Sequence, residues 1–371
     1  MEKAIKLHSI FQEYMIPTVT IENRSVADVV SIFERVNSTG TRLNAVDFMR
    51  AVTWSESFDL NTELKKVYDE FAQKGFTVKN ETLVKTLAII DGLDPTPSSM
   101  LELRQIPPAK LHETMQRLKQ RVEEARLFLL EHFAMRSYAY LPYEGQLLAL
   151  VKFLDISTTT QTQATGEMVK WIWATSFNEE LRGKPDHFVT RILDRVADLV
   201  AGNASALTTR LNLNTDDLIE RRFIRGKALS AAFVCLFAKK EARSIFTGKV
   251  IPSALYMRDF ATHNFDGLIA VDSLGHVLGK TFPSRKLFAS TCLFMDEELM
   301  ANEHLDLIQK IQLCRSVHKA DSESILASQF INQRAADAAL SGDISLFLKH
   351  RAIDLLQAAA FVVAGRSVDG K

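Results

Sequence analysis

The sequence lacks the features that mark secreted and membrane proteins. Its three cysteines, Cys235, Cys292 and Cys314, are an odd number without the paired spacing of a zinc site, and their apolar surroundings fit a reducing cytosol. No signal peptide is recognisable at the N-terminus. The longest apolar runs, residues 228–238 and 355–365, are far shorter than the about 20 residues that span a bilayer. We therefore expect a cytoplasmic protein without a membrane segment, whose apolar runs form buried helices.

An excess of charge of either sign is also missing, because 45 lysines and arginines balance 45 aspartates and glutamates. No global positive field attracts nucleic acid, so any contact with DNA has to use local basic patches. The sequence contains no phosphate loop (GxxxxGKS or GxxxxGKT), no GxGxxG, no HExxH and no GxSxG. The common nucleotide-binding, dinucleotide-binding, zinc-protease and esterase motifs are thus excluded.

Helical periodicity, by contrast, runs through most of the chain. Between Pro108 and Ala134 the apolar residues recur mostly in steps of four and three, which predicts a long amphipathic helix packed on a core. Similar periodicity predicts further helices at residues 83–90, 147–154, 168–181, 188–200 and 322–340. The polar segment 157–166 predicts a surface loop. Trp171 and Trp173 lie two apart, so one is expected in the core and the other partly exposed or at an interface.

A different order of elements is expected after about Thr262. Short apolar runs at residues 268–271 and 290–295 predict two strands, and a helix is expected from Asp296 toward Cys314. Strand, loop, strand and helix follow one another in this way in a ββα-metal nuclease finger. We expect a mainly α, multi-helix bundle with a small ββα-like insertion near the C-terminus. Its three expected parts are residues 1–60, 61–262 and 263–371.

The finger-like segment contains candidates for metal-dependent DNA cleavage. In such fingers a histidine after the first strand activates water, while other groups hold a divalent cation against the scissile phosphate. His276 is the candidate base, and Asp272 just upstream is a candidate metal ligand. Asn302 and His304 lie on the expected helix, two residues apart, so only one of them faces the metal, with His304 as the candidate ligand. The expected cation is Mg²⁺ or Mn²⁺ if the chain is catalytic, and otherwise no cofactor is expected.

Basic residues near this segment are candidates for contacts with DNA phosphates. Arg285 and Lys286 adjoin the finger-like segment and Lys280 precedes them, while Arg221 and Arg222 belong to a second basic cluster. A groove that combines two such clusters grips phosphates without reading bases. Each cluster by itself is more typical of a solvated helix face, and that alternative stays open.

The most distinctive motif is IFERVNSTGTRL at residues 32–43. With Phe33, Asn37, Gly40 and Leu43, it resembles the FERxNxxGxxL segment of the GmrSD-type family of bacterial DNA-restriction proteins. Members of that family have a ParB/sulfiredoxin-like N-terminal domain with a nucleotide-site motif upstream of this segment. That motif is missing from this sequence, so the resemblance implies that residues 1–60 hold only a remnant of the domain and a linking helix.

The end of the chain adds a second resemblance to this family. The sequences FINQR at residues 330–334 and FLKHRA at 347–352 resemble the family's closing helix pair. On the expected helix, Arg351 shares a stripe with apolar residues, which predicts a helix-packing or ion-pair role for it. The family's C-terminal region reads His-His-Ile-Phe-Pro, with the histidine three residues before the proline. Here Lys280 stands three before Pro283, so the finger-like segment is a divergent one.

Two hypotheses about function follow. In the first, the chain is a DNA-targeting component of a bacterial restriction or phage-defence system that cuts DNA through His276 and Asp272. In the second, the finger is inactive, and the chain is a helical module that binds DNA, a separate N-terminal domain or a partner subunit. The irregular spacing between His276 and Pro283 favours the second hypothesis, whereas the family resemblance favours the first.

Overall fold

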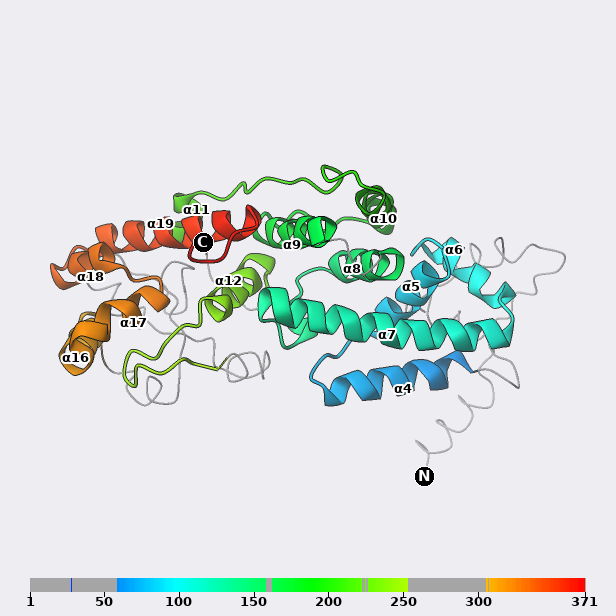
Figure 1. The fold of residues 1–371 in the computed structure, drawn as a ribbon, viewed down its shortest axis with the longest axis horizontal. Coiled ribbons are helices and arrows are strands. Elements are labelled where there is room, and N and C mark those ends of the chain that lie inside the picture. The colour runs from blue at the N-terminus through cyan, green and yellow to red at the C-terminus, as the bar shows by residue number, and fades with distance from the viewer. Residues whose placement is uncertain are drawn as a thin grey trace, which may run out of the picture. The chain divides into compact units, whose positions relative to one another are not determined.

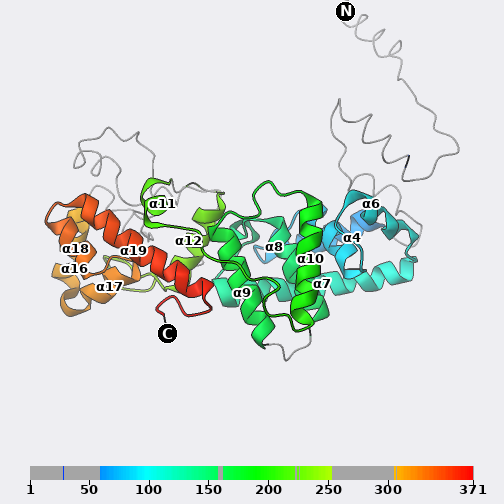
Figure 2. The same cartoon turned by 90° about the horizontal axis from the view of Figure 1, so that it is seen from above.

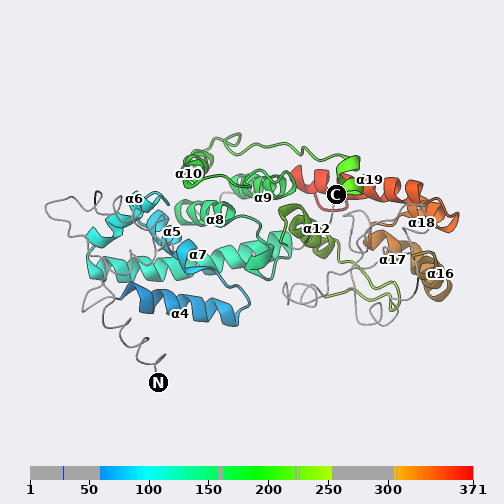
Figure 3. The same ribbon diagram turned by 180° about the vertical axis from the view of Figure 1, so that it is seen from behind.

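The fold was analysed in a computed structural model of the whole chain (Figures 1, 2 and 3). The residues that it describes are 28, 59–157, 162–221, 224, 226–252, 305 and 307–370. The chain divides into two compact units, Met1–Phe48 and Met49–Lys371, and every described residue except Asp28 belongs to the second. Within the described ranges the regular elements are helices, and the only bridge is an isolated antiparallel one between Arg243 and Val250. The prediction of a mainly α fold is confirmed.

The helices before residue 201 follow one another with short connections. They are α4 (Leu60–Gln73), α5 (Asn80–Ile90), α6 (Pro97–Met100), η1 (Leu101–Gln105), α7 (Pro108–Phe133), η2 (Tyr138–Tyr140), α8 (Glu144–Ile156), α9 (Thr162–Phe177) and α10 (Asp186–Val200). The later helices are α11 (Thr215–Glu220), α12 (Ala228–Lys239), α16 (Leu307–His318), η4 (Lys319–Asp321), α17 (Ser322–Ser328), α18 (Gln333–Leu340) and α19 (Ile344–Val363).

Two helices are buried on nearly all sides. Every residue of α5 from Thr82 to Ile90 is buried, and this helix contacts α4, α6, α7 and α8. Every residue of α12 from Ala228 to Ala238 is buried as well, against α7, α9 and η2. A helix that is apolar around its whole circumference belongs in an interior, where neighbours cover each face. Helices α4, α6, α7 and α8 therefore pack around α5, and α7, α9 and η2 pack around α12.

One buried charge links three helices around α5. The Lys85 ammonium lies 2.8 Å from Glu144 Oε2 and 3.1 Å from Asp186 Oδ1. Glu144 and Asp186 are the first residues of α8 and α10, where a carboxylate also interacts favourably with the helix dipole. Burial lowers the pKa of Lys85, but the hydrogen bonds and fields of Glu144 and Asp186 outweigh burial and raise that pKa above its usual value. Lys85 therefore stays charged and fixes α5 to α8 and α10.

The long amphipathic helix predicted between Pro108 and Ala134 is confirmed as α7. Its buried face carries Leu111, Met115, Leu118, Val122, Ala125 and Leu129. The helix ends where Ala134 adopts the left-handed conformation, with φ 52°, and its N–H bonds to Leu129 O. Periodicity also located α5, α8 and α10, whose burial patterns follow the apolar residues.

Three local predictions were wrong. Helix α9 begins at Thr162, within the predicted loop 157–166, and it ends at Phe177 instead of Leu181. Both tryptophans are buried, with 2% exposure each, because α9 packs against α12 on one side and α19 on another. The ring of Trp173 lies 4.8 Å from that of Phe133 and 5.6 Å from that of Phe177.

The third wrong prediction is a continuous helix over residues 322–340. The chain interrupts it between α17 and α18, where Phe330 has φ 56° and the backbone turns. Asn332 then caps α18, because its side chain accepts a hydrogen bond of 2.8 Å from the N–H of Ala335. Asparagine favours this capping position over a helix interior, so local hydrogen bonding overrides the apolar periodicity.

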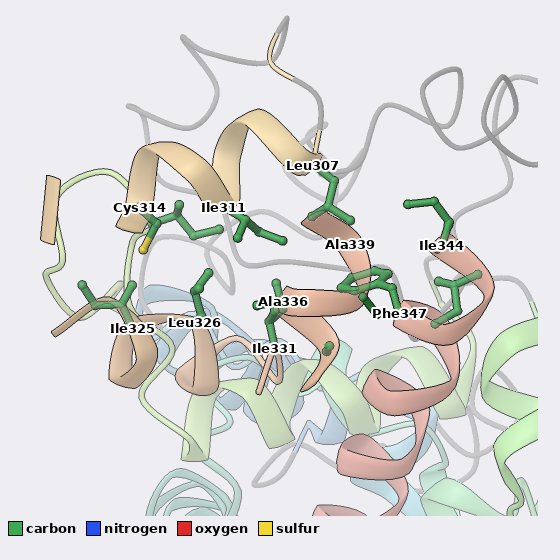
Figure 4. Close-up of a cluster of buried hydrophobic side chains, with 14 residues drawn as sticks. Leu307, Ile311, Cys314, Ile325, Leu326, Ile331, Ala336, Ala339, Ile344 and Phe347 are labelled. Atoms are coloured by element: carbon green, nitrogen blue, oxygen red, sulfur yellow. The ribbon is translucent and has the colours of Figure 1, made fainter. Parts of the chain in front are cut away.

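Helices α16 to α19 enclose an apolar cluster of their own (Figure 4). In the close-up, Ile311 and Cys314 of α16 lie on the side of Ile325 and Leu326 of α17, whereas Leu307 points toward Ala339 of α18. Ala336, Ala339, Ile344 and Phe347 complete the cluster from α18 and α19. Helix α16 contains the end of the helix expected to run toward Cys314. The two predicted strands of the ββα-like insertion, and the start of its helix at Asp296, lie outside the described residues.

The two described cysteines are free and buried, as expected for core residues. Burial raises the pKa of the Cys235 thiol, and it raises that of Cys314 to about 11. Cys292 lies outside the described ranges. Across the part of the chain that the structure covers, no helix combines the length and apolar character needed to cross a membrane.

The acid stability of the α7 region is predicted to depend on Glu123. Hydrogen bonds from Arg126, and a further one from Lys74, lower the pKa of Glu123. Burial acts in the opposite direction, and the net result is a pKa of about 2. A depressed pKa stabilises the fold above the unfolded-state value of about 4.3, and this stabilisation is lost as the pH falls toward 2. Glu123→Gln should cost about 1 kcal/mol at pH 7 and flatten the loss of stability between these pH values.

This prediction is checked by urea unfolding of both proteins at pH 7, 4 and 3. Glu113→Gln, at an exposed acid on the same helix, is the matched control. Identical pH slopes for the wild type and Glu123→Gln would contradict the assigned role of Glu123.

Candidate functional site

Most residues predicted for function fall outside the part of the chain that the structure describes. They are Phe33, Asn37, Gly40, Leu43, Arg222, Asp272, His276, Lys280, Arg285, Lys286, Asn302 and His304. Among the described residues, no group of three or more histidines, cysteines, aspartates or glutamates is placed to hold a metal ion. The cleavage site and its cation therefore remain predictions from the sequence.

Arg221 is the one predicted DNA-binding residue that the structure describes. It directly follows α11, and its guanidinium lies 3.0 Å from Asp217 Oδ1 and 3.4 Å from Glu179 Oε2. Its side chain is 46% exposed. Arg221 thus fixes the end of α11 to the turn after α9. A contact between Arg221 and a phosphate would have to compete with these two carboxylates.

The candidate site in the described part is a cleft of about 270 Å³ beside α19. We call it the α19 cleft. It is lined by Lys240, Ala327, Phe330, Asn332, Asp354, Gln357, Ala358, Phe361, Val368 and Asp369. These residues come from the end of α12, the end of α17, the link to α18, α19 and the tail after α19, so five segments build one hollow.

Asp354 is the most perturbed acid of the α19 cleft. Burial raises its pKa above the usual value, although hydrogen bonds from Asn332 and the charges of His350 and Lys240 act in the opposite direction. No ion pair joins Asp354 to a lysine or arginine of the described ranges. A partly buried carboxylate in a cleft whose pKa is raised by burial is a candidate for function.

Lys240 has partners of its own within the α19 cleft. Its ammonium forms an ion pair with Asp369 and lies 5.7 Å from the centre of the Phe330 ring. The ionisable lining residues are thus one lysine and two aspartates, which gives a net charge of −1 when all three are ionised. The walls between them are apolar or aromatic, notably Phe330 and Phe361.

The tail after α19 closes one side of the cleft. Gly365 has φ +76°, and the next N–H, that of Arg366, bonds to Phe361 O at 2.8 Å, which turns the chain back along the helix. Val368 is buried at the cleft wall. A Cβ on Gly370 would lie 2.7 Å from the Phe361 ring, so the close approach of the tail requires glycine there.

Arg351 holds the opposite wall in place. It is fully buried, and its Nη2 donates a 3.0 Å hydrogen bond to the carbonyl oxygen of Gln329, directly before Phe330. Its guanidinium carbon lies 5.9 Å from the centre of the Phe237 ring of α12. The arginine thus connects α19, α12 and the link between α17 and α18, which agrees with the predicted packing role.

Sequence reasoning missed the α19 cleft. Its lining residues carry no motif spacing, because they are spread from residue 240 to residue 369. The only local signals were Gly365 and Gly370 after the last helix, and these predict a turn without predicting what the turn covers.

Comparisons of the chain with protein-family models, with curated proteins and with solved structures found no match. The GmrSD-type resemblance therefore rests on the motifs in the sequence.

Replacing Arg351 is predicted to destabilise the fold. Arg351→Ala removes a fully buried side chain and leaves Gln329 O without its donor, which should cost about 3 kcal/mol. Arg351→Lys keeps the charge and most of the alkyl stem but loses the planar fork, so it should cost less. Urea unfolding monitored by far-UV circular dichroism measures both. An unchanged stability of Arg351→Ala would refute the assigned role.

Proposed function

We propose that this chain is a DNA-targeting component of a bacterial restriction or phage-defence system of the GmrSD type. In this proposal the helices of the described part form the body of the protein. DNA cleavage belongs to residues 263–314, with His276 as base, Asp272 and His304 as metal ligands, and Lys280, Arg285 and Lys286 as phosphate contacts. The proposal starts from the three motif segments in the sequence.

One structural observation supports it. The two C-terminal segments that resemble the family's closing helix pair lie in neighbouring, contacting helices of this fold. Arg351 of FLKHRA bonds to Gln329, the residue before FINQR, and Phe330 of FINQR packs edge-on against Phe237 at 4.9 Å. Helices α18 and α19 contact each other, as a helix pair does. One residue of each segment, Arg351 and Phe330, thus takes part in the packing of this region.

The proposed chemistry needs a divalent cation, Mg²⁺ or Mn²⁺, which stabilises charge on the phosphate. The proposed base and ligands lie outside the described residues, so we derive no step of the reaction through the metal.

A plasmid-nicking assay tests the catalytic part of this proposal. The wild-type chain should nick supercoiled DNA with Mg²⁺ or Mn²⁺, and His276→Ala should lower the rate by about a hundredfold or more, as expected for loss of a general base. His187→Ala, at an exposed histidine of α10, is the matched control and should retain activity. Nicking that survives in His276→Ala would refute the proposed base.

A second candidate function is a non-catalytic helical module that binds DNA, a separate N-terminal domain or another partner subunit. It is favoured by the engagement of several arginines with acids of the same chain. Arg117 and Arg121 both contact Asp155 at 3.0 and 3.1 Å, and Arg243 pairs with Asp321 at 2.6 Å. Such intramolecular pairs reduce the positive charge that is available to phosphates.

Binding to a short DNA duplex, measured at several salt concentrations, separates DNA targeting from the form of the second candidate that binds only protein. If the DNA-targeting proposal holds, the double variant Arg285→Gln/Lys286→Gln should bind at least about tenfold more weakly and with a smaller salt dependence. Lys65→Gln/Lys66→Gln, which removes the same charge from the exposed face of α4, should bind as the wild type does. No DNA binding by the wild type, together with no nicking under either metal, would leave the partner-binding module.

A further inference from the structure

We propose that the α19 cleft binds a primary ammonium group on an alkyl stem, with Asp354 as its counter-ion. This inference is independent of the proposed role in DNA restriction, because it uses only the described residues between α12 and the C-terminal tail.

The first argument is the state of the Asp354 carboxylate. It is half-buried at a cleft wall and accepts hydrogen bonds from Asn332, yet no lysine or arginine of the described ranges forms an ion pair with it. The charges of His350 and Lys240 offset the cost of burying this carboxylate only in part, since its pKa stays raised, and a cation that enters the cleft recovers more of that cost. An anion would instead be repelled by Asp354.

The second argument is that the nearest lysine does not fill this role. Lys240 points to Asp369, with which it forms the ion pair, and it lies over the ring of Phe330. With Lys240 and Asp369 neutralising each other, the remaining charge of the lining is that of Asp354. A second cation therefore meets a net negative cleft.

The third argument is the character of the walls. Phe330 and Phe361 border the cleft, and Ala327, Ala358 and Val368 supply small apolar surfaces. Aromatic faces attract ammonium groups, and apolar surface favours the methylenes of an alkyl stem. Gln357 and Asn332 add amide oxygens that accept hydrogen bonds from an ammonium.

The volume agrees with such a ligand. About 270 Å³ accommodates a chain of four or five methylenes with its ammonium, but it lies below the usual range for drug-sized ligands. The same chemistry is offered by a free alkylamine and by a lysine side chain of a partner protein, and the experiment below distinguishes these sources.

Saturation-transfer NMR on the full chain at pH 7.5 tests the inference, with butylammonium as probe. Butanol and butyrate, of similar shape but without positive charge, are the matched ligands and should bind at least about tenfold more weakly. Asp354→Asn should weaken butylammonium binding by at least about tenfold, whereas Glu323→Gln, at an exposed acid of α17 outside the cleft, should leave it unchanged.

A second variant keeps the test decisive if Asp354→Asn does not fold. Ala327→Phe inserts bulk into the cleft from α17 without changing a charge, and it should also abolish binding. Nα-acetyl-lysine methylamide identifies the source. Binding of this blocked lysine assigns the cleft to a lysine side chain, and binding of butylammonium alone assigns it to a free amine. Equal binding of butylammonium and butanol, no binding of either amine, or binding that persists in both cleft variants would overturn the inference.

Discussion

The C-terminal half of the described structure depends on the burial of one guanidinium. Arg351 reaches from the middle of α19 to the carbonyl oxygen of Gln329 and to the ring of Phe237, so it contacts a helix, a link and a second helix at once. Burying arginine is costly, and the hydrogen bond from Nη2 to Gln329 O and the nearby Phe237 ring offset part of that cost. The position of the link then determines where Phe330 and Asn332 lie. In this way the wall of the α19 cleft follows from one buried contact.

A second buried cation has the corresponding role near α5. Lys85 meets the first residues of α8 and α10, and each of those carboxylates also faces the positive end of its own helix. The helix dipole stabilises a carboxylate at the first residues of a helix, independently of any contact with the lysine. The lysine therefore joins groups that the helices have already positioned, which is why a single side chain can connect three helices.

The sequence was sufficient for those parts of the fold that depend on local order. The apolar faces of α7 and α10 could be predicted because apolar residues recur there at helical spacing within one continuous segment. The burial of Trp173 was not, because it depends on α12 and α19 covering α9 from two sides. The break before α18 was missed because Phe330 takes a left-handed conformation that nothing in its residue type favours. The α19 cleft could not be predicted because its lining residues, among them residues 240, 332, 354 and 369, are far apart in the sequence and come together only in the folded chain.

The buried thiols have a practical consequence for studying this protein in solution. Cys235 lies inside α12, and Cys314 faces the cluster of α16 to α19, each shielded from solvent and held as the unreactive protonated form. A thiol-reactive reagent reaches either sulfur only when its surroundings open. Because the two sulfurs belong to different packing regions, their separate modification rates form a natural pair of reporters, one for opening around the central helix and one for opening of the C-terminal helices.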